Sequence, residues 1–253
     1  MKRFLKPIIT AILSFVVGIG IGLGVIHSVQ ESAKAPSIGK IEQISNIAKD
    51  IPFLDARTIR KSRSSVVRVM SLSEDQQVFS SATGTYLTIH GRYFVLTVNH
   101  GIQGPCDLTR IEASNEFVNC VQYIELNSTV DYAIVEIEKL SSRTPIKIPQ
   151  GLAKDKRDFA IMTSVYYTGF PNGAGPLTLD GKVIGYMGSD FIYIKSYAWS
   201  GSSGAGVFSS TGKLIGYVLA LDVGYTEYGI DVIENIVFVV PITSVRWDAL
   251  LEG

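Results

Sequence analysis

The spacing of polar and apolar residues changes along this chain. Residues 1–6 contain Lys2, Arg3 and Lys6 and no acid, and residues 7–26 carry no charged side chain. From Ser65 onward the apolar residues form short runs, separated by Gly, Asn, Asp and Pro. The first pattern predicts a membrane-spanning helix. The second predicts a domain built from short strands.

The strand-rich part is divided at intervals of about ten residues, which is typical of an all-β domain. The predicted strands are 66–70, 84–89, 93–98, 117–124, 132–138, 159–167, 181–187, 191–197, 206–208, 213–221 and 236–240. No helical pattern alternates with them, so a parallel α/β sheet is disfavoured and an antiparallel barrel or sandwich is expected. A short helix over 242–251, capped by Thr243 or Ser244, would close the chain.

Residues 7–26 would span about 30 Å as a helix, which matches the bilayer core. Basic residues precede this run and none follows closely, so we expect the N-terminus in the cytoplasm and the domain on the periplasmic or extracellular side. The alternative is secretion after signal cleavage. The run is long for a signal peptide, and the small-x-small site Ala33-Lys34-Ala35 is followed by Pro36. A signal anchor over 7–26 is therefore predicted, with lipid as its partner.

Glycines in this span would allow it to self-associate. They form overlapping G-x-x-x-G pairs on one helix side, where a second helix could approach closely: Gly18, Gly20, Gly22 and Gly24. The alternative is that glycine is simply common in membrane helices.

Residues 27–61 are predicted to be a tether. Residues 28–40 are polar, and Pro36 and Gly39 interrupt any helix. Apolar residues then recur at helical spacing and predict one short helix: Ile41, Ile44, Ile47 and Ala48. The basic stretch 57–63 reads as a solvated face, and we assign it no function.

Composition narrows the range of partners. The 23 basic and 23 acidic residues balance, and no basic run follows residues 1–6 except 57–63, so nucleic acid is not an expected partner. Two cysteines are too few for a disulfide scaffold, and Cys106 and Cys120 lack metal-site spacing. No metal or cofactor is expected. In an oxidising compartment these cysteines would form either a disulfide or two buried thiols.

The segment from Trp199 to Gly206 contains a candidate nucleophile. Its sequence, Trp-Ser-Gly-Ser-Ser-Gly-Ala-Gly, places Ser203 in a G-x-S-G pattern. Glycine adopts the tight backbone turns that project a serine side chain and aim N–H groups at a reacting carbonyl. An ordinary Ser/Gly loop has the same composition, so Ser203 needs a base and an acid elsewhere in the chain.

Histidine is the usual base, and this chain has 3. His27 follows the predicted membrane span, and His90 lies beside Gly91 in a hairpin turn. His100 follows an apolar strand, which is a rigid platform for a catalytic side chain. His100 is therefore the candidate base. A hydrogen-bonded histidine in a strand-to-loop corner is the alternative.

Asp131 is the candidate acid. It precedes a strand in which Ala133, Val135 and Ile137 share one face. There a partly buried carboxylate could accept the imidazole N–H and hold the tautomer. The alternative is an aspartate that caps a turn.

Together these segments resemble the trypsin-like (chymotrypsin-fold) serine peptidases, most of all the high-temperature-requirement type and related viral and phage peptidases. The similarity spans about residues 62–250, and the motifs follow the family's order. They are Gly84-Thr85-Tyr86-Leu87, Thr97-Val98-Asn99-His100, Asp131-Tyr132-Ala133-Ile134, Gly169-Phe170-Pro171-Asn172-Gly173, Gly201-Ser202-Ser203-Gly204, Leu214-Ile215-Gly216-Tyr217 and Val240-Pro241-Ile242.

This resemblance implies an all-β domain over 62–253, with two antiparallel six-stranded barrels over about 62–155 and 156–245. It also implies a serine endopeptidase acting on polypeptides through Ser203, His100 and Asp131, with the N–H groups of Gly201 and Ser203 as the oxyanion hole. The substrate pocket would involve Tyr197, Val218, Leu219 and Ala220, and the absence of an acid at Tyr197 favours a small or medium apolar side chain. No peptide-binding PDZ module is expected after residue 253.

One departure from the family pattern is Ala205, which stands where a second glycine is most common. Two other functions remain open at this point. The domain could be a catalytically inactive trypsin-like module that only binds, or a membrane-tethered β-sandwich adaptor with a coincidental Gly-Ser-Ser-Gly loop.

Overall fold

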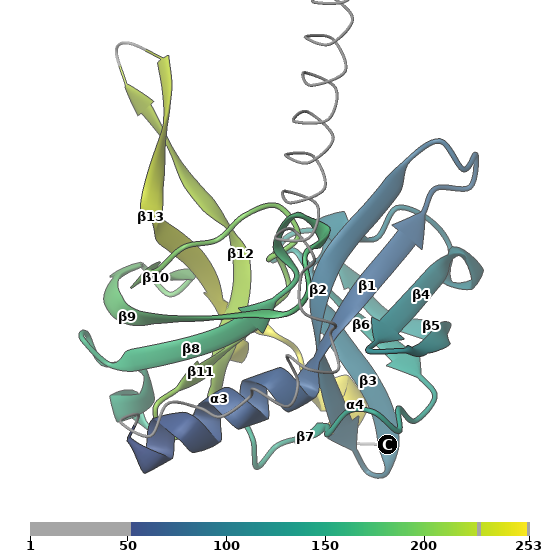
Figure 1. The fold of residues 1–253 in the computed structure, drawn as a ribbon, viewed down its shortest axis with the longest axis horizontal. Coiled ribbons are helices and arrows are strands. Elements are labelled where there is room, and N and C mark those ends of the chain that lie inside the picture. Colours follow the sequence, from purple (N-terminus) through teal and green to yellow (C-terminus); the bar gives the residue numbers. More distant parts are fainter. Residues whose placement is uncertain (1–51, 227–228, 252–253) are drawn as a thin grey trace, which may run out of the picture. The chain divides into compact units, whose positions relative to one another are not determined.

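The computed structural model describes residues 52–226 and 229–251, which form two closed β-barrels (Figure 1). The strands of barrel one are β1 (Val66–Leu72), β2 (Phe79–Ile89), β3 (Arg92–Thr97), β4 (Thr109–Ala113), β5 (Glu116–Asn127) and β6 (Tyr132–Ile137). They pair antiparallel in the order β1-β4-β5-β6-β3-β2, and β2 returns to β1. The two-residue strand β7 (Ile146–Lys147) adds to β2 in parallel.

Barrel two follows in the sequence. Its strands are β8 (Ser164–Gly169), β9 (Leu177–Met187), β10 (Phe191–Lys195), β11 (Gly206–Ser209), β12 (Leu214–Thr226) and β13 (Gly229–Pro241), closed in the order β10-β13-β12-β11-β8-β9. The prediction of two six-stranded antiparallel barrels is confirmed.

Three apolar clusters account for this architecture. One fills barrel one around Val67, Val95 and Val135, and one fills barrel two around Val165 and Ile215. The third lies between the barrels and joins outward-facing residues of β2, β3 and β6 to residues of barrel two and the C-terminus: Leu87, Phe94, Leu96, Ile134, Phe208, Tyr217 and Trp247. These three strands are buried on both faces, which explains the apolar runs 93–96 of β3 and 132–135 of β6 in the sequence.

The seam between the barrels is a major source of stability. Each fully buried Leu, Ile or Phe contributes about 1.5–3 kcal/mol relative to an exposed one. Leu87, Phe94, Leu96 and Ile134 are each at most 1 % exposed. The barrels are therefore held together by apolar packing, and the groups carried by one are fixed against those of the other.

A helix that the sequence did not predict crosses barrel two (Figure 1). α3 (Phe53–Ser65) includes the basic stretch that we expected to be a solvated face. Instead, Lys61 Nζ donates to Gly212 O at 2.5 Å, and Arg63 Nη1 donates to Thr178 Oγ1 at 2.9 Å. Ser62 Oγ also donates to Thr168 Oγ1 at 2.8 Å. Hydrogen bonds from these polar side chains hold the helix on barrel two. The helix was therefore not predicted from the periodicity of apolar residues.

Several strand predictions were wrong in extent. β4 and β7 were not predicted, although Thr109, Ile111 and Ala113 alternate as the buried residues of β4. The strand predicted to begin at residue 159 begins at Ser164, because Asp155 caps a 3₁₀ turn, η3 (Lys156–Phe159), just before it. The predicted gap over 222–235 contains a two-stranded extension of β12 and β13 that projects from the barrel (Figure 1).

The predicted C-terminal helix is divided. A 3₁₀ turn, η5 (Ile242–Ser244), is followed by extended Val245 and then by the short helix α4 (Asp248–Leu251). Val245 and Trp247 are buried in the seam, and the Trp247 indole N–H donates to Ile242 O at 3.2 Å. Packing of these two side chains interrupts the helix that Thr243 or Ser244 was expected to cap.

The predicted anchor over 7–26, its four glycines and most of the tether lie outside the described residues. Within 52–226 and 229–251, no helix is long and apolar enough to cross a membrane.

Candidate active site

His100 and Asp131 lie together at one end of barrel one. His100 is in the 3₁₀ turn η1 (Asn99–Gly101), just after β3, and Asp131 directly precedes β6. Thr97 of β3 is paired with Ala133 of β6, so strand register brings the two side chains together. His100 Nδ1 lies 2.6 Å from Asp131 Oδ2, and the His100 backbone N–H donates to Asp131 Oδ1 at 2.8 Å.

This arrangement determines which ring nitrogen of His100 is available. Both Asp131 oxygens act as acceptors, so a neutral His100 carries its proton on Nδ1 and leaves the Nε2 lone pair free. The His100 side chain is 53% exposed and that of Asp131 is 24% exposed. The ring is therefore accessible to a reacting group, while the carboxylate that orients it is largely covered.

Barrel two helps to hold Asp131. The Tyr217 hydroxyl, on β12, donates to Val130 O at 2.9 Å. Burial raises the pKa of Tyr217, so its hydroxyl stays protonated and remains a donor. Asp131 itself has a φ of 60°, in the left-handed region that aspartate tolerates better than most residues. The acid is fixed from both barrels.

Ser203 lies on the loop that precedes β11 in barrel two. Gly201 has a φ of 91° and Gly204 a φ of 87°, which other residues rarely adopt. A Cβ at Gly204 would overlap the Thr83 carbonyl oxygen, so glycine is required there by conformation and by space. Ala205 is fully buried in the core of barrel two, and the loop accommodates its methyl group.

The N–H groups of this loop fall into two sets. Those of Ser202, Gly204 and Ala205 donate to Trp199 O at 2.8 Å, Val218 O at 2.7 Å and Ser202 O at 3.1 Å. Those of Gly201 and Ser203 have no acceptor among the described residues. Two backbone donors on either side of Ser202 thus remain available to a ligand.

The structure joins His100 to Asp131, but within the described part of the chain no hydrogen bond links the Ser203 hydroxyl to the His100 ring. Hydrogen bonds between a catalytic nucleophile and its base often tighten only in the complex with substrate.

Of the predicted pocket residues, Val218 contacts the same loop. Val218 is buried, and its N–H donates to Ala205 O at 2.9 Å. Leu219 packs against the seam, and Ala220 follows it on β12. Tyr197 and Trp199 are 51% and 42% exposed, with ring centroids 6.0 Å apart and nearly parallel. An exposed aromatic pair therefore lies just before the candidate nucleophile.

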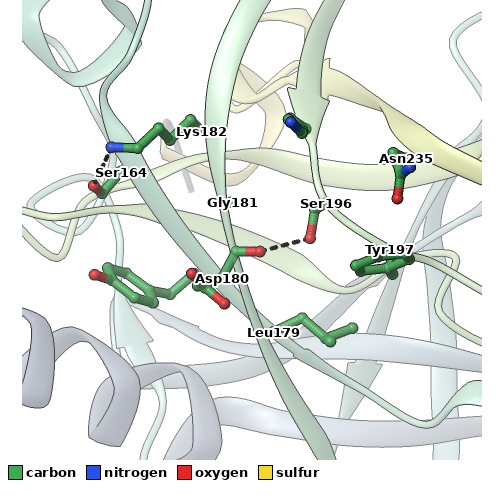
Figure 2. A pocket seen from close by; sticks show the side chains of 10 residues that line it. Ser164, Leu179, Asp180, Gly181, Lys182, Ser196, Tyr197 and Asn235 are labelled. Atoms are coloured by element: carbon green, nitrogen blue, oxygen red, sulfur yellow. Dashed lines mark hydrogen bonds between the residues drawn. The ribbon is translucent and has the colours of Figure 1, made fainter.

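A cavity of about 660 Å³ lies beside Tyr197 on barrel two (Figure 2). Figure 2 shows Leu179 and Tyr197 on one side of it, and Lys182 with Ser164 on the other. Asp180, Lys182 and Lys195 also line it. Sequence reasoning found no acid near Tyr197, but the fold brings Asp180 there from β9. Two lysines offset that single acid, so the cavity is not suited to a cationic side chain.

Cys106 and Cys120 are joined in a disulfide. It links the turn η2 (Cys106–Leu108) to β5, on the barrel-one side that follows His100. The two alternatives left open by the sequence were a disulfide and two buried thiols, and the structure has the disulfide.

Three residues that support the site were not singled out from the sequence. Thr83 and Asn172 bind the nucleophile loop, and Tyr217 binds the segment before Asp131. Asn172 and Tyr217 fall inside motifs that carry the family resemblance, and Thr83 directly precedes one. All three residues therefore lie in or beside motifs of the sequence. Their hydrogen-bond partners could not be predicted, because those partners depend on how the two barrels pack together.

Comparison with solved structures shows proteins of the same fold. The Rv3671c protease from M. tuberculosis in its active form is 18% identical, with a TM-score of 0.60, over 76% of this chain and 83% of that one. The serine endoprotease from Yersinia pestis is also 18% identical, with a TM-score of 0.60, over 81% of this chain and 69% of that one. No curated protein sequence matches the chain.

A comparison with protein-family models identifies one family. The model of the trypsin-like peptidase domain matches residues 82–216, which is more than half of the 253-residue chain and includes His100, Asp131 and Ser203. With its two barrels and this match, the chain belongs to the trypsin-like peptidase family.

Proposed function

We propose that this peptidase is an endopeptidase that hydrolyses peptide bonds with Ser203 as nucleophile, His100 as general base and acid, and Asp131 as the group that orients His100. The observation that carries the proposal is the His100–Asp131 pair, with Asp131 bound to both the ring and the backbone N–H of His100. An aspartate that merely capped a turn would not need to bind the imidazole.

The chemistry follows from this arrangement. Ser203 Oγ attacks the substrate carbonyl carbon while His100 Nε2 takes its proton, and Asp131 stabilises the imidazolium that forms. His100 then protonates the leaving amine, the C–N bond breaks, and an acyl-enzyme remains on Ser203. Water attacks this ester with His100 again as base, which releases the acid and restores the serine.

The Gly201 and Ser203 N–H groups would stabilise the negative oxygen of the tetrahedral intermediates. Both lack an acceptor within the described part of the chain, and the glycine at 201 allows the required turn. Loss of one such donor in a well-studied protease costs about 3 kcal/mol of transition-state stabilisation. A module that only binds would not require a paired His and Asp beside two unengaged donors, so that alternative is not favoured.

A serine-directed fluorophosphonate tests the nucleophile. We expect it to label the wild-type protein and not a Ser203→Ala variant, because only Ser203 is proposed to have an activating base. Intact mass and peptide mapping measure the adduct. Ser200→Ala, which removes an exposed hydroxyl from the same loop, is the matched control and should label at the wild-type rate. Folded wild-type protein that stays unlabelled would contradict the enzyme proposal.

We propose that the side chain before the cleaved bond is small or medium and apolar. Tyr197 presents an exposed aromatic ring just before the nucleophile loop. The cavity beside it is lined by Lys182 and Lys195 as well as Asp180, and these charges do not favour a cation.

A panel of peptides that vary only at this residue tests the preference. We expect kcat/KM to be at least about tenfold higher for Ala or Val than for Arg or Lys, since burying an unpaired cation is costly. Cleavage rates measured by mass spectrometry give the ratio. Preferred cleavage after Arg would contradict the proposed pocket.

We propose that residues 7–26 anchor the protein in a membrane, with the peptidase domain on the outer side. The uncharged length of this segment and the basic residues before it support the anchor. The disulfide is compatible with an oxidising outer compartment.

Cell fractionation tests the anchor. The full chain should remain in the membrane after extraction at high pH, and its N-terminal peptide should still be detected by mass spectrometry. A variant that lacks residues 7–26 should be lost from that fraction. A mature protein that begins after Ala35 would show cleavage and secretion instead.

A further inference from the structure

Thr83 connects barrel one to both sides of the candidate nucleophile. It lies on β2, it is fully buried, and every one of its polar groups is engaged. Its backbone N–H donates to Ser203 O at 2.9 Å, and its own carbonyl accepts a hydrogen bond from Thr97 Oγ1 at 2.7 Å. Thr83 is thus fixed in barrel one by β3 and reaches the loop of barrel two.

The Thr83 hydroxyl makes two further bonds across the seam. It donates to Gly201 O at 2.6 Å and accepts from the Phe170 N–H at 3.0 Å. One hydroxyl therefore joins the nucleophile loop to the segment that follows β8. A hydroxyl is required for this, because it must donate to one partner and accept from the other.

The Phe170 segment holds the peptide that carries the Gly201 N–H. The Asn172 N–H donates to Ser200 O at 2.6 Å. In a trans peptide the C=O and the following N–H point in opposite directions, so this bond sets the direction of the Gly201 N–H. Thr83 acts on this peptide indirectly, by fixing Phe170 two residues before Asn172.

Every carbonyl from Ser200 to Ser203 is consequently anchored. The Ser200 carbonyl accepts from the Asn172 N–H, and the Gly201 carbonyl accepts from the Thr83 hydroxyl. The Ser202 carbonyl accepts from the Ala205 N–H, and the Ser203 carbonyl accepts from the Thr83 N–H. The Gly201 and Ser203 N–H groups are left over, and these are the proposed oxyanion donors. Gly201 is intrinsically free to rotate, so the loop depends on such bonds to keep one orientation.

We propose that Thr83 is a positioning residue whose hydroxyl holds the oxyanion-hole loop in its reactive orientation. This inference rests on the proposed function of Ser203. Thr83 does not touch the substrate. Its hydroxyl fixes the Gly201 carbonyl directly and the Gly201 N–H through Phe170 and Asn172.

Three variants separate positioning from a general contribution to stability. Thr83→Val removes both hydroxyl bonds but keeps the backbone bond to Ser203, and Thr83→Ser keeps the hydroxyl. Thr109→Val is the matched control. Thr109 is also fully buried in barrel one, but it lies on β4, away from the nucleophile loop. Its hydroxyl donates to Ser71 Oγ at 3.0 Å and lies within hydrogen-bond distance of the Tyr123 hydroxyl, at 2.7 Å.

Two readouts are compared, and the first needs no turnover. Hydrogen–deuterium exchange over residues 199–205 should rise at least about fivefold in Thr83→Val and stay at the wild-type level in Thr109→Val. On a cleaved peptide, kcat should fall about 10- to 100-fold in Thr83→Val with KM within about twofold, since misplaced donors weaken transition-state binding. Thr83→Ser should restore kcat to within about threefold of wild type.

The proposal is overturned if exchange over 199–205 in Thr83→Val matches that in Thr109→Val, or if Thr83→Ser is as slow as Thr83→Val. A loss of kcat equal to that of Thr109→Val would also overturn it, since it would report stability alone. Failure of the proposed function gives a different result. Wild-type protein would then neither cleave peptide nor react with fluorophosphonate, whatever the exchange data show.

Discussion

Apolar packing between the two barrels is the constraint on which the candidate site depends. β2, β3 and β6 bury residues on both faces, and their outer faces meet Phe208 and Tyr217 of barrel two. His100 and Asp131 belong to barrel one and Ser203 to barrel two, so the seam sets their relative positions. Polar contacts across it include those of Tyr217 with Val130 and of Thr83 with Gly201, Ser203 and Phe170. Packing brings the barrels together, and these bonds fix the loops.

The candidate site combines a fixed pair with a tightly anchored loop. Asp131 uses both oxygens on His100, which sets the tautomer and leaves Nε2 for proton transfer. Around Ser203, Gly201 and Gly204 adopt turns that other residues would strain, and hydrogen bonds to successive carbonyls compensate for the freedom of glycine. Both features are built into the fold, and such preorganisation is what stabilises a developing charge most effectively.

Sequence patterns predicted the strands that have a clear apolar pattern of their own. They did not predict the elements and contacts that depend on tertiary packing. The strands around Phe94 and Ile134 were clear because burial on both faces gives each of them a run of four apolar residues. α3 was missed because it is fastened by Lys61, Ser62 and Arg63, which resemble solvent-exposed residues in a sequence. His100 and Asp131 were selected by elimination and strand position, yet their contact depends on the register between β3 and β6. Thr83 could not be assigned a role, since all its loop partners come from barrel two.

The central claim is that Ser203, His100 and the Gly201 and Ser203 N–H groups act on one reacting centre. A crystal structure of the protein after reaction with a fluorophosphonate tests it most directly, because the phosphoryl oxygen occupies the place of the tetrahedral oxyanion. We expect phosphorus bonded to Ser203 Oγ, with the phosphoryl oxygen about 3 Å from both backbone nitrogens. An adduct on Ser203 whose phosphoryl oxygen points away from these nitrogens, or an adduct on another serine, would contradict it.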